Sequence, residues 1–254
     1  MNILNHIMAA TRERVARDKR AGLPPCASAR KPFAFEQSLR RADDIALICE
    51  VKKASPTNGI IAAEFPYRDI AADYEAGGAA AISVLTEPDF FLGDDRYLAE
   101  IRETVAAPLL RKDFIVDPFQ IEQASRLGAD AVLLICAILT PGQLAQYITV
   151  ADGLGLSSLV EAHDEAELRM ALASGARVVG VNNRNLKTFE VDTGNSIRLR
   201  SLAPPDVVMV SESGIRTAAD VALLRRHGID AVLIGETLMR SPDRKAAMAE
   251  LRGQ

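Results

Sequence analysis

The sequence predicts a (β/α)8 barrel, or TIM barrel, with an N-terminal helical extension. Eight short apolar segments alternate with eight amphipathic segments along the chain, which is the pattern of repeated strand–helix units. Four of the apolar segments also resemble one another and recur about every 50 residues. The alternative is an open doubly wound sheet, but no G-x-G-x-x-G motif follows the first apolar segment to support it.

The recurring segments share a glycine that precedes an apolar run. They are GGAAAISVL from Gly77, LGADAVLLI from Leu127, SGARVVGVN from Ser174 and HGIDAVLIG from His227. Such a glycine can end a helix by adopting positive φ, after which the chain enters a buried strand. Because a βα unit takes about half of the repeat length, the repeat marks every second strand.

The other strands and the helices fill the gaps between these segments. The remaining strands are expected near residues 45–51, 107–113, 157–163 and 207–213. Amphipathic helices are expected within residues 66–78, 95–105, 118–128, 141–155, 164–175, 195–204, 217–228 and 242–253. Eight units leave no residues for a second domain, so we expect residues 1–254 to form one domain with residues 1–44 as its extension.

The extension begins with a helical pattern. Ile3, Leu4, Ile7, Met8 and Val15 share one face, which predicts a leading amphipathic helix, and residues 22–33 are expected to form an extended loop. Residues from the extension could plug the bottom of the barrel or cover its top and shape a binding site. The pattern alone favours neither.

Composition excludes several classes of protein. The net charge of -4 argues against a nucleic-acid partner. Three cysteines and three histidines are scattered, so we expect no disulfide framework, no metal site and no cofactor. The first residues lack a signal-peptide pattern and no apolar run approaches the roughly 20 residues that cross a bilayer. We therefore expect a cytoplasmic protein with no membrane partner, and a monomer because no long apolar stripe demands a second chain.

Charged and amide side chains gather where the predicted strands end. In this fold those carboxyl ends converge on one mouth, where active sites are built. Five of the eight strand ends carry such groups, namely Glu50, Lys52, Lys112, Glu161, Asn182, Arg184 and Glu212. One charged strand end could simply be solvated, but unpaired buried charge is costly. The group as a whole therefore indicates a catalytic site.

Glycines follow the last two predicted strands. Gly214 lies in SESGI (211–215) and Gly235 in IGETLM (234–239). In barrels these two loops often hold a phosphate through backbone N–H groups, which glycine allows to approach the oxygens. Tight turns are the alternative explanation for both residues. The pattern favours a phosphorylated small-molecule substrate.

Six motifs in order along the chain resemble those of indole-3-glycerol phosphate synthase. They are CEVKKASPTNG, LLRKDFIVDPFQI, LVEAH, GVNNRNLKTFEVD, SESGI and AVLIGETLMRSPD. The combination of E-x-K-x-x-S-P, K-D-F and N-N-R-N-L is specific, whereas SESGI alone fits several phosphate-binding barrels. The resemblance implies ring closure of 1-(2-carboxyphenylamino)-1-deoxyribulose 5-phosphate to indole-3-glycerol phosphate, carbon dioxide and water. It also implies that the extension lies over the barrel mouth.

The resemblance assigns roles in proton transfer to three residues. Lys112, in the K-D-F motif, matches the general acid beside the ketone oxygen, and Glu161 matches the general base. Lys52 matches the cation that orients the substrate carboxylate and protonates the departing hydroxyl. Glu50 and Glu212 resemble the carboxylates that hold the lysines and the sugar hydroxyls.

The remaining matches are binding residues. Asn182 and Arg184 resemble groups near the substrate carboxylate and aromatic ring. The family's contacts to the phosphate and to the loop after the first strand match Ser55, Ser213, Gly214, Gly235 and Glu236. Its apolar pocket walls match Phe91, Phe114 and Leu133. One departure is the sequence TNG after Pro56, where many relatives carry a serine and a lysine.

Three residues beside the predicted site are assigned structural roles. Cys49 and Cys136 lie on predicted strands with no paired base, so we expect buried structural thiols. His163 lies two residues beyond Glu161 and could be a base; a rim or structural histidine is our expectation.

Two other functions stay open at this stage. An isomerase on the same fold, such as phosphoribosylanthranilate isomerase, would be expected to use a Cys or Asp acid–base pair at its first and fifth strands. This chain has Glu50 and Glu161 there. A non-catalytic phosphate binder would be indicated by loss of Lys112 or Glu161, and both are present.

Overall fold

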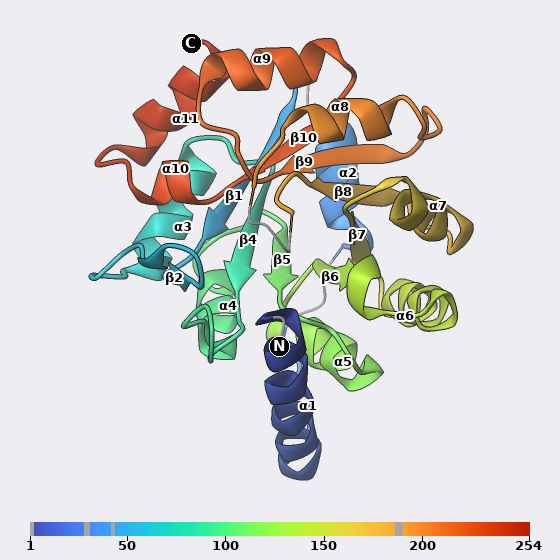
Figure 1. Ribbon diagram of the computed structural model, residues 1–254. Coiled ribbons are helices and arrows are strands. Elements are labelled where there is room, and N and C mark those ends of the chain that lie inside the picture. The colour runs from blue at the N-terminus through green and yellow to red at the C-terminus, as the bar shows by residue number, and fades with distance from the viewer. Residues whose placement is uncertain (1–2, 28–30, 42–43, 186–189) are drawn as a thin grey trace.

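Eight parallel strands close into a barrel, which confirms the predicted fold (Figure 1). The computed structural model describes residues 3–27, 31–41, 44–185 and 190–254. The strand order around the barrel is β1-β10-β9-β8-β7-β6-β5-β4. Their bounds are Ala46–Val51 (β1), Ala81–Leu85 (β4), Leu109–Lys112 (β5), Ala131–Ile135 (β6), Ser157–Ala162 (β7), Val178–Asn182 (β8), Val208–Glu212 (β9) and Ala231–Ile234 (β10).

A helix follows each barrel strand and packs outside it, as the amphipathic pattern predicts. The helices are Tyr67–Ala76 (α3), Asp95–Arg102 (α4), Pro118–Leu127 (α5), Pro141–Gly153 (α6), Glu165–Ala173 (α7), Gly194–Arg200 (α8), Ala218–Arg226 (α9) and Arg244–Arg252 (α11). Gly78, Gly128, Gly175 and Gly228 have φ values of 78°, 92°, 88° and 74°. The helix-ending role predicted for these glycines is therefore confirmed.

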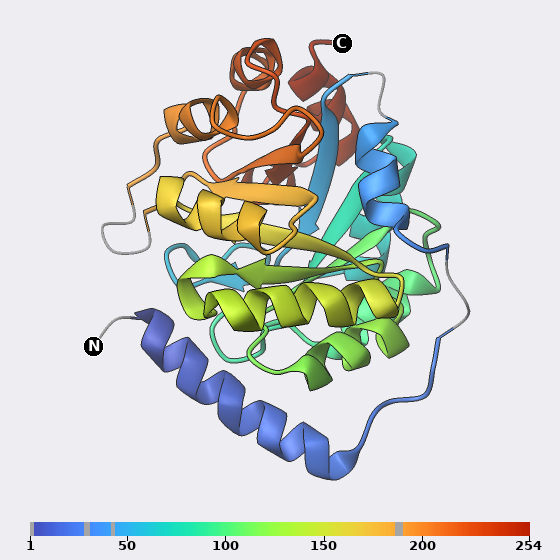
Figure 2. The same ribbon diagram turned by 90° about the vertical axis from the view of Figure 1, so that its right-hand side faces the viewer.

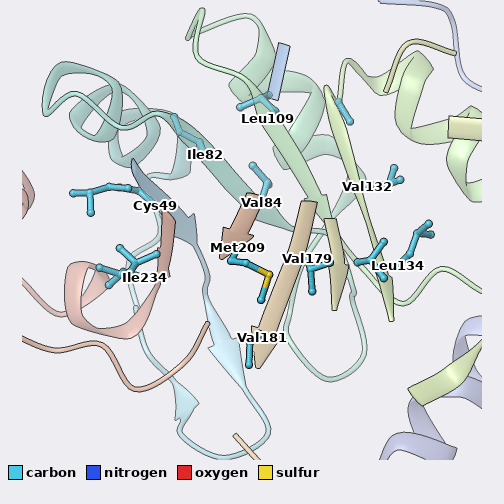
Figure 3. Close-up of a cluster of buried hydrophobic side chains, with 14 of the residues drawn as sticks. Cys49, Ile82, Val84, Leu109, Val132, Leu134, Val179, Val181, Met209 and Ile234 are labelled. Carbon is cyan, nitrogen blue, oxygen red and sulfur yellow. The ribbon is translucent and has the colours of Figure 1, made fainter. Parts of the chain in front are cut away.

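Successive strand residues alternate between two apolar layers. Figure 3 shows part of the outer layer, in which Cys49, Val132 and Val179 belong to the cluster that packs beneath the helices. The intervening residues, such as Ile48, Leu133 and Leu159, form a second cluster inside the barrel. Because side chains in a strand alternate between its two faces, the next inward position on each strand points toward the mouth.

The two helices of the extension take different places: α2 (Ala34–Arg40) closes the bottom of the barrel, whereas α1 (Ile3–Ala21) runs along its side. Helix α2, which the sequence pattern missed, buries Phe35 and Leu39 in the inner cluster. Its Glu36 N–H donates to Ser157 Oγ, at the first residue of β7. Helix α1 packs beside α5, and its N-terminal end lies at the opposite end of the barrel (Figure 2). The extension thus both plugs the bottom and reaches the mouth.

Short elements occupy the loops at the barrel mouth. Strands β2 (Ala54–Ser55) and β3 (Gly59–Ile60) pair antiparallel after β1, a 3-10 turn (Cys136–Ile138) follows β6, and α10 (Glu236–Met239) follows β10. Within the described residues, no helix is long and apolar enough to cross a membrane.

Candidate active site

A cavity of about 240 Å³ opens at the carboxyl ends of the strands. All fifteen residues that the sequence predicted for the site line it: Glu50, Lys52, Ser55, Phe91, Lys112, Phe114, Leu133, Glu161, Asn182, Arg184, Glu212, Ser213, Gly214, Gly235 and Glu236. Residues 186–189 of the motif GVNNRNLKTFEVD lie outside the described residues. The structure thus brings together in one pocket residues that are up to 186 positions apart in the sequence.

The charged residues continue the inward-facing rows of the barrel. Lys112 follows Leu110, and Glu161 follows Leu159, at the next position of the same face. Glu50, Lys112, Glu161 and Glu212 are residues of the strands themselves, at or next to the carboxyl end of each strand. The strand backbone, hydrogen-bonded on both sides, therefore holds these side chains on a rigid frame.

The charges on either side of Lys112 face the other way. Arg111 is only 1% exposed and lies in the layer between strands and helices. It donates to Gln123 Oε1 at 2.9 Å and contacts Asp113 at 3.3 Å. Asp113 also binds Arg14 of α1, with a nitrogen–oxygen distance of 2.6 Å. The run of three charges thus serves two purposes, because Arg111 and Asp113 tie α1 and α5 to the barrel while Lys112 faces the pocket.

Lys112 lies between two buried carboxylates. Its Nζ is 3.3 Å from Glu161 Oε2 and 3.2 Å from Glu212 Oε2. Burial by itself lowers the pKa of Lys112, but the carboxylates of Glu212, Glu161 and Glu50 outweigh burial and raise it. Lys112 is therefore charged in the free protein and has a proton that it can donate.

The two carboxylates differ although they share one lysine. Burial raises the pKa of Glu212 to about 7, and the Lys112 charge offsets only part of that rise. Burial acts on Glu161 in the same direction, but Lys112, His163 and a hydrogen bond from Asn182 together lower its pKa. Such divergence between neighbouring carboxyls is typical of acid–base sites. Glu161 is thus the ionised partner, able to accept a proton.

Gly180 on β8 provides the space that Glu212 occupies. A Cβ at this position would clash with Glu212 Oε1. No pattern in the sequence marks this residue, because its role depends on a side chain from the neighbouring strand. The glycine therefore supports the geometry around Lys112 without lining the pocket.

Lys52 forms a second charged pair at the end of β1. Its Nζ lies 2.6 Å from Glu50 Oε1. A Cβ at Gly235 would lie 2.5 Å from that oxygen and 3.0 Å from Lys52 Nζ. Gly235 therefore leaves room for the pair as well as forming part of the loop after β10.

The amide of Asn182 connects the catalytic centre to the neighbouring loops. Its Oδ1 accepts from Ser213 Oγ and from the Arg184 N–H, both at 3.0 Å. Asn182 also hydrogen-bonds the side chain of Glu161. One amide thereby contacts the Glu161 side chain and both loops that carry Ser213 and Arg184.

The loops after β9 and β10 form the polar end of the pocket. Ser213 and Gly214 have φ values of 69° and 88°, so the backbone turns sharply at the end of β9. A Cβ at Gly214 would also clash with Val191. Glu236 Oε2 accepts from Asn58 Nδ2 at 2.8 Å, so the TNG sequence that departs from many relatives joins the loops after β1 and β10. Backbone N–H groups in glycine-containing turns of this kind can bind a phosphate.

Aromatic and aliphatic side chains form the opposite wall. The rings of Phe91 and Phe114 lie with centroids 6.1 Å apart. Ile3, Leu4 and Ile7 of α1 also line the cavity, a contribution that the helical pattern alone could not locate. A flat aromatic group fits between such walls.

The thiols behave as expected. Cys49 and Cys136 are free and buried, and burial raises the pKa of each to about 12. In the described part of the chain, no group of three or more His, Cys, Asp or Glu residues has the arrangement of a metal site.

The fold and the site define an acid–base enzyme of the (β/α)8-barrel class. The family model of indole-3-glycerol phosphate synthase matches residues 4–251. A protein of that name from Ruminiclostridium cellulolyticum is 62% identical over 88% of this chain and 86% of its own length. Another, from Endomicrobium trichonymphae, is 51% identical over 98% of this chain and 99% of its own length. The chain therefore belongs to the indole-3-glycerol phosphate synthase family and is a carboxy-lyase of tryptophan biosynthesis.

Solved structures with lower sequence identity share the fold alone. A 3-hexulose-6-phosphate synthase superposes with a TM-score of 0.67 at 14% identity, covering 82% of this chain and 99% of that chain. The thiamine phosphate pyrophosphorylase of Pyrococcus furiosus gives 0.61 at 18% identity, covering 82% and 94%. The family match, in contrast, favours the synthase over the isomerase and over a non-catalytic binder.

Proposed function

We propose that the enzyme closes the indole ring of 1-(2-carboxyphenylamino)-1-deoxyribulose 5-phosphate with Lys112 as general acid and Glu161 as general base. The observation that carries this proposal is the position of Lys112 Nζ, 3.3 Å from Glu161 and 3.2 Å from Glu212 at the barrel mouth. A cation held in this way can donate to a ketone oxygen as charge develops on it.

The first half of the reaction forms the carbon–carbon bond. The aromatic carbon that bears the carboxylate attacks the sugar ketone, and Lys112 protonates the oxygen. Lys52 binds the substrate carboxylate and holds the ring in line, with Glu50 fixing the lysine at 2.6 Å. The carbon–carboxylate bond then breaks, and its electrons restore the aromatic ring as carbon dioxide leaves.

The second half removes water. Lys52 protonates the hydroxyl as it departs, and Glu161 takes a proton from the newly closed ring to form the double bond. Its lowered pKa keeps Glu161 ionised for this step. Two protons are given by the lysines and one is recovered by Glu161, so each turnover takes up one proton.

The remaining site residues bind the substrate. We assign the phosphate to the polar end, with Ser55 and Ser213 as hydroxyl donors and the backbone of Gly214, Gly235 and Glu236 as N–H donors. The Glu236 carboxylate is engaged with Asn58 and Arg240, so its backbone is the group assigned to the phosphate. The anthranilate ring lies against Phe91, Phe114 and Leu133, with Asn182 and Arg184 beside its carboxylate.

Two variants test the assignment. Purified enzyme is mixed with the substrate without added metal or cofactor, and indole fluorescence is followed. We expect Lys112→Ala and Glu161→Gln each to lose roughly 10²–10⁴-fold in kcat. Lys245→Ala, on the exposed side of α11, is the matched control and should behave as wild type. An active Lys112→Ala enzyme would contradict the assignment of Lys112 as the general acid. Absence of turnover by the wild-type enzyme would contradict the proposed ring-closure activity itself.

We also propose that the enzyme works as a monomer in the cytoplasm, on a phosphorylated small molecule and without nucleic-acid or membrane partners. The support is that this chain by itself supplies all fifteen predicted site residues, together with the biosynthetic character of the family. Light scattering with size-exclusion chromatography, and fractionation of cells, test these two points; a stable dimer or a membrane-bound fraction would contradict them.

A further inference from the structure

Asn183 is buried behind the loop after β9, on the side away from the pocket. Along β8, Val179 and Val181 belong to the outer apolar layer, and Asn183 follows them at the next position of the same face. Asn182, in contrast, lines the cavity. The two adjacent asparagines thus face opposite sides of the strand end.

The side chain of Asn183 belongs to a network of buried polar groups. Its Oδ1 accepts from the Ser196 N–H at 3.2 Å and from Ser196 Oγ at 2.8 Å. Its Nδ2 donates to Ser211 Oγ at 2.9 Å and to the carbonyl oxygen of Ser213 at 3.1 Å. The backbone N–H of Ser196 can only donate and the carbonyl of Ser213 can only accept, so the orientation of the amide is unambiguous. The Nδ2 group is thereby fixed toward Ser213.

The polar character of this network is unusual for the layer in which it lies. Ser196 and Ser211 are fully buried, yet nearby positions of the same layer, such as Val181 and Met209, are apolar. Burying polar groups costs free energy that hydrogen bonds only offset, and apolar side chains would fill the space without that cost. One contact of the network reaches beyond packing, because Ser213 lines the pocket.

Both asparagines hold Ser213 in a conformation that few residues adopt. Its φ of 69° lies in the left-handed region, which is unfavourable for a residue with a Cβ. Its Oγ donates to Asn182 Oδ1 at 3.0 Å, and its carbonyl oxygen accepts from Asn183 Nδ2. Because these bonds act on both the side chain and the backbone, they compensate for the strain and fix the peptide group between Ser213 and Gly214.

The direction of this peptide group determines where the N–H of Gly214 points. In a planar trans peptide the C=O and the following N–H point in opposite directions. The Ser213 carbonyl points toward Asn183, so the Gly214 N–H points away from it, and Gly214 itself lines the cavity. Within the residues that the structure describes, this N–H has no hydrogen-bond acceptor. It is therefore available to a ligand.

We propose that Asn183 is a positioning residue for phosphate binding, because its amide fixes the Ser213–Gly214 peptide with the Gly214 N–H directed at a phosphate oxygen. This inference rests on the proposed assignment of the phosphate to the loops after β9 and β10. Asn183 acts through the peptide and does not touch the substrate. A hydrogen bond from an N–H to a phosphate is charge-assisted, and a donor that is already aligned loses little entropy on binding. The effect of Asn183 should therefore fall on phosphate affinity.

Two variants remove the Asn183 donor in different ways. Asn183→Asp keeps the shape of the side chain and an acceptor for Ser196, whereas Asn183→Ala truncates it, so a folding defect in one leaves the other informative. Ser196→Ala is the matched control, because it removes a buried hydrogen bond of the same network and leaves the donor to Ser213 in place. Urea unfolding establishes that each variant is folded.

Inorganic phosphate and anthranilate, used as competitive inhibitors, probe the two ends of the pocket separately. We expect both Asn183 variants to raise the Ki of phosphate and the KM of the substrate by about tenfold, which corresponds to the loss of one hydrogen bond to a charged group. The Ki of anthranilate and kcat should stay within about twofold of wild type, because the ring end of the pocket keeps its contacts. Ser196→Ala should leave all of these values unchanged.

The Gly214 amide gives a second readout that does not depend on turnover. The protein is labelled selectively at glycine, and its NMR spectrum is followed as inorganic phosphate is added. We expect the assigned Gly214 amide proton resonance of wild type to move downfield, because a new hydrogen bond to the anion forms. In the Asn183 variants the shift at the same phosphate concentration should be much smaller.

Four results would overturn this role of Asn183. They are an unchanged phosphate Ki in both variants, an equal loss of phosphate and anthranilate affinity, an effect of Ser196→Ala as large as that of the Asn183 variants, and a wild-type Gly214 resonance that does not respond to phosphate. The proposed activity fails separately. A wild-type protein that does not turn over the substrate, but whose Gly214 resonance shifts with phosphate, would remove the activity and leave the role of Asn183 in place.

Discussion

The substitution Glu212→Gln should raise the free energy of unfolding of the protein while lowering its kcat. Glu212 is buried and its pKa is about 7, compared with 4.5 for an ordinary glutamate. Below pH 4.5 the carboxyl is protonated in the folded and unfolded states alike, so its titration does not lower the free energy of unfolding. Between pH 4.5 and 7 the folded protein binds more protons than the unfolded chain, so the free energy of unfolding falls as pH rises.

The full cost at pH 8 follows from the difference between the two pKa values. A pKa of about 7 against 4.5 corresponds to about 3 kcal/mol of lost stability. Glutamine has nearly the same shape and stays neutral, so it removes this cost. The free energy of unfolding of Glu212→Gln should therefore exceed that of wild type by up to about 3 kcal/mol at pH 8, and by less than about 1 kcal/mol at pH 5.

Urea unfolding of both proteins at pH 5 and pH 8 measures these differences, and the indole fluorescence assay measures kcat. We expect kcat to fall, because Lys112 loses one of the two carboxylates that hold it. A variant that is less stable than wild type at pH 8, or equally more stable at both pH values, would refute the reasoning. The first result would show that ionised Glu212 is a net stabilising partner of Lys112.

Two further predictions concern residues that support the site. Gly180→Ala should displace the Glu212 carboxylate and lower kcat by about tenfold or more. Gly153→Ala, where an added Cβ meets no atom, is the matched control and should leave kcat unchanged. Equal kcat in the two variants would contradict the steric argument. Arg14→Leu should lower the free energy of unfolding, measured in urea, by about 3 kcal/mol, because it leaves the buried carboxylate of Asp113 with fewer partners. It should also raise KM, because α1, which lines the pocket, loses this contact to the barrel. Arg17→Leu, at an exposed position of α1, is the control, and equal effects of the two substitutions would contradict a stabilising role for the buried pair.

The sequence predicted the barrel because the barrel is built from local patterns. A strand or helix pattern can be recognised without knowing the rest of the fold, as in the apolar run 45–51 and the amphipathic stretch 118–128. A glycine such as Gly128 likewise indicates the end of a helix, because it can adopt positive φ. Two features could not be predicted from such local patterns. Helix α2 has too few residues to show a period, and the inner position of Gly180 has meaning only beside Glu212.

Membership of the site was also predictable from the sequence, because parallel strands end at one mouth and motifs such as K-D-F identify the residues there. Alternation along each strand even specifies that Lys112 faces inward when Leu110 does. The relation between those residues was not predictable. Lys112, Glu161 and Glu212 are separated by 49 and 51 positions, and their contacts of 3.3 and 3.2 Å depend on the closure of the barrel.

Sequence alone therefore determined the fold, the family and the set of chemical groups, since each follows from local pattern or from motif. Tertiary structure decided how those groups act. Burial raises the pKa of Glu212, while the charges and the amide around Glu161 lower its pKa, although the two residues are chemically identical. It also placed His163 against Glu161, and the first residues of α1 against the pocket. These properties arise from long-range contacts and from exclusion of water, which no stretch of sequence contains by itself.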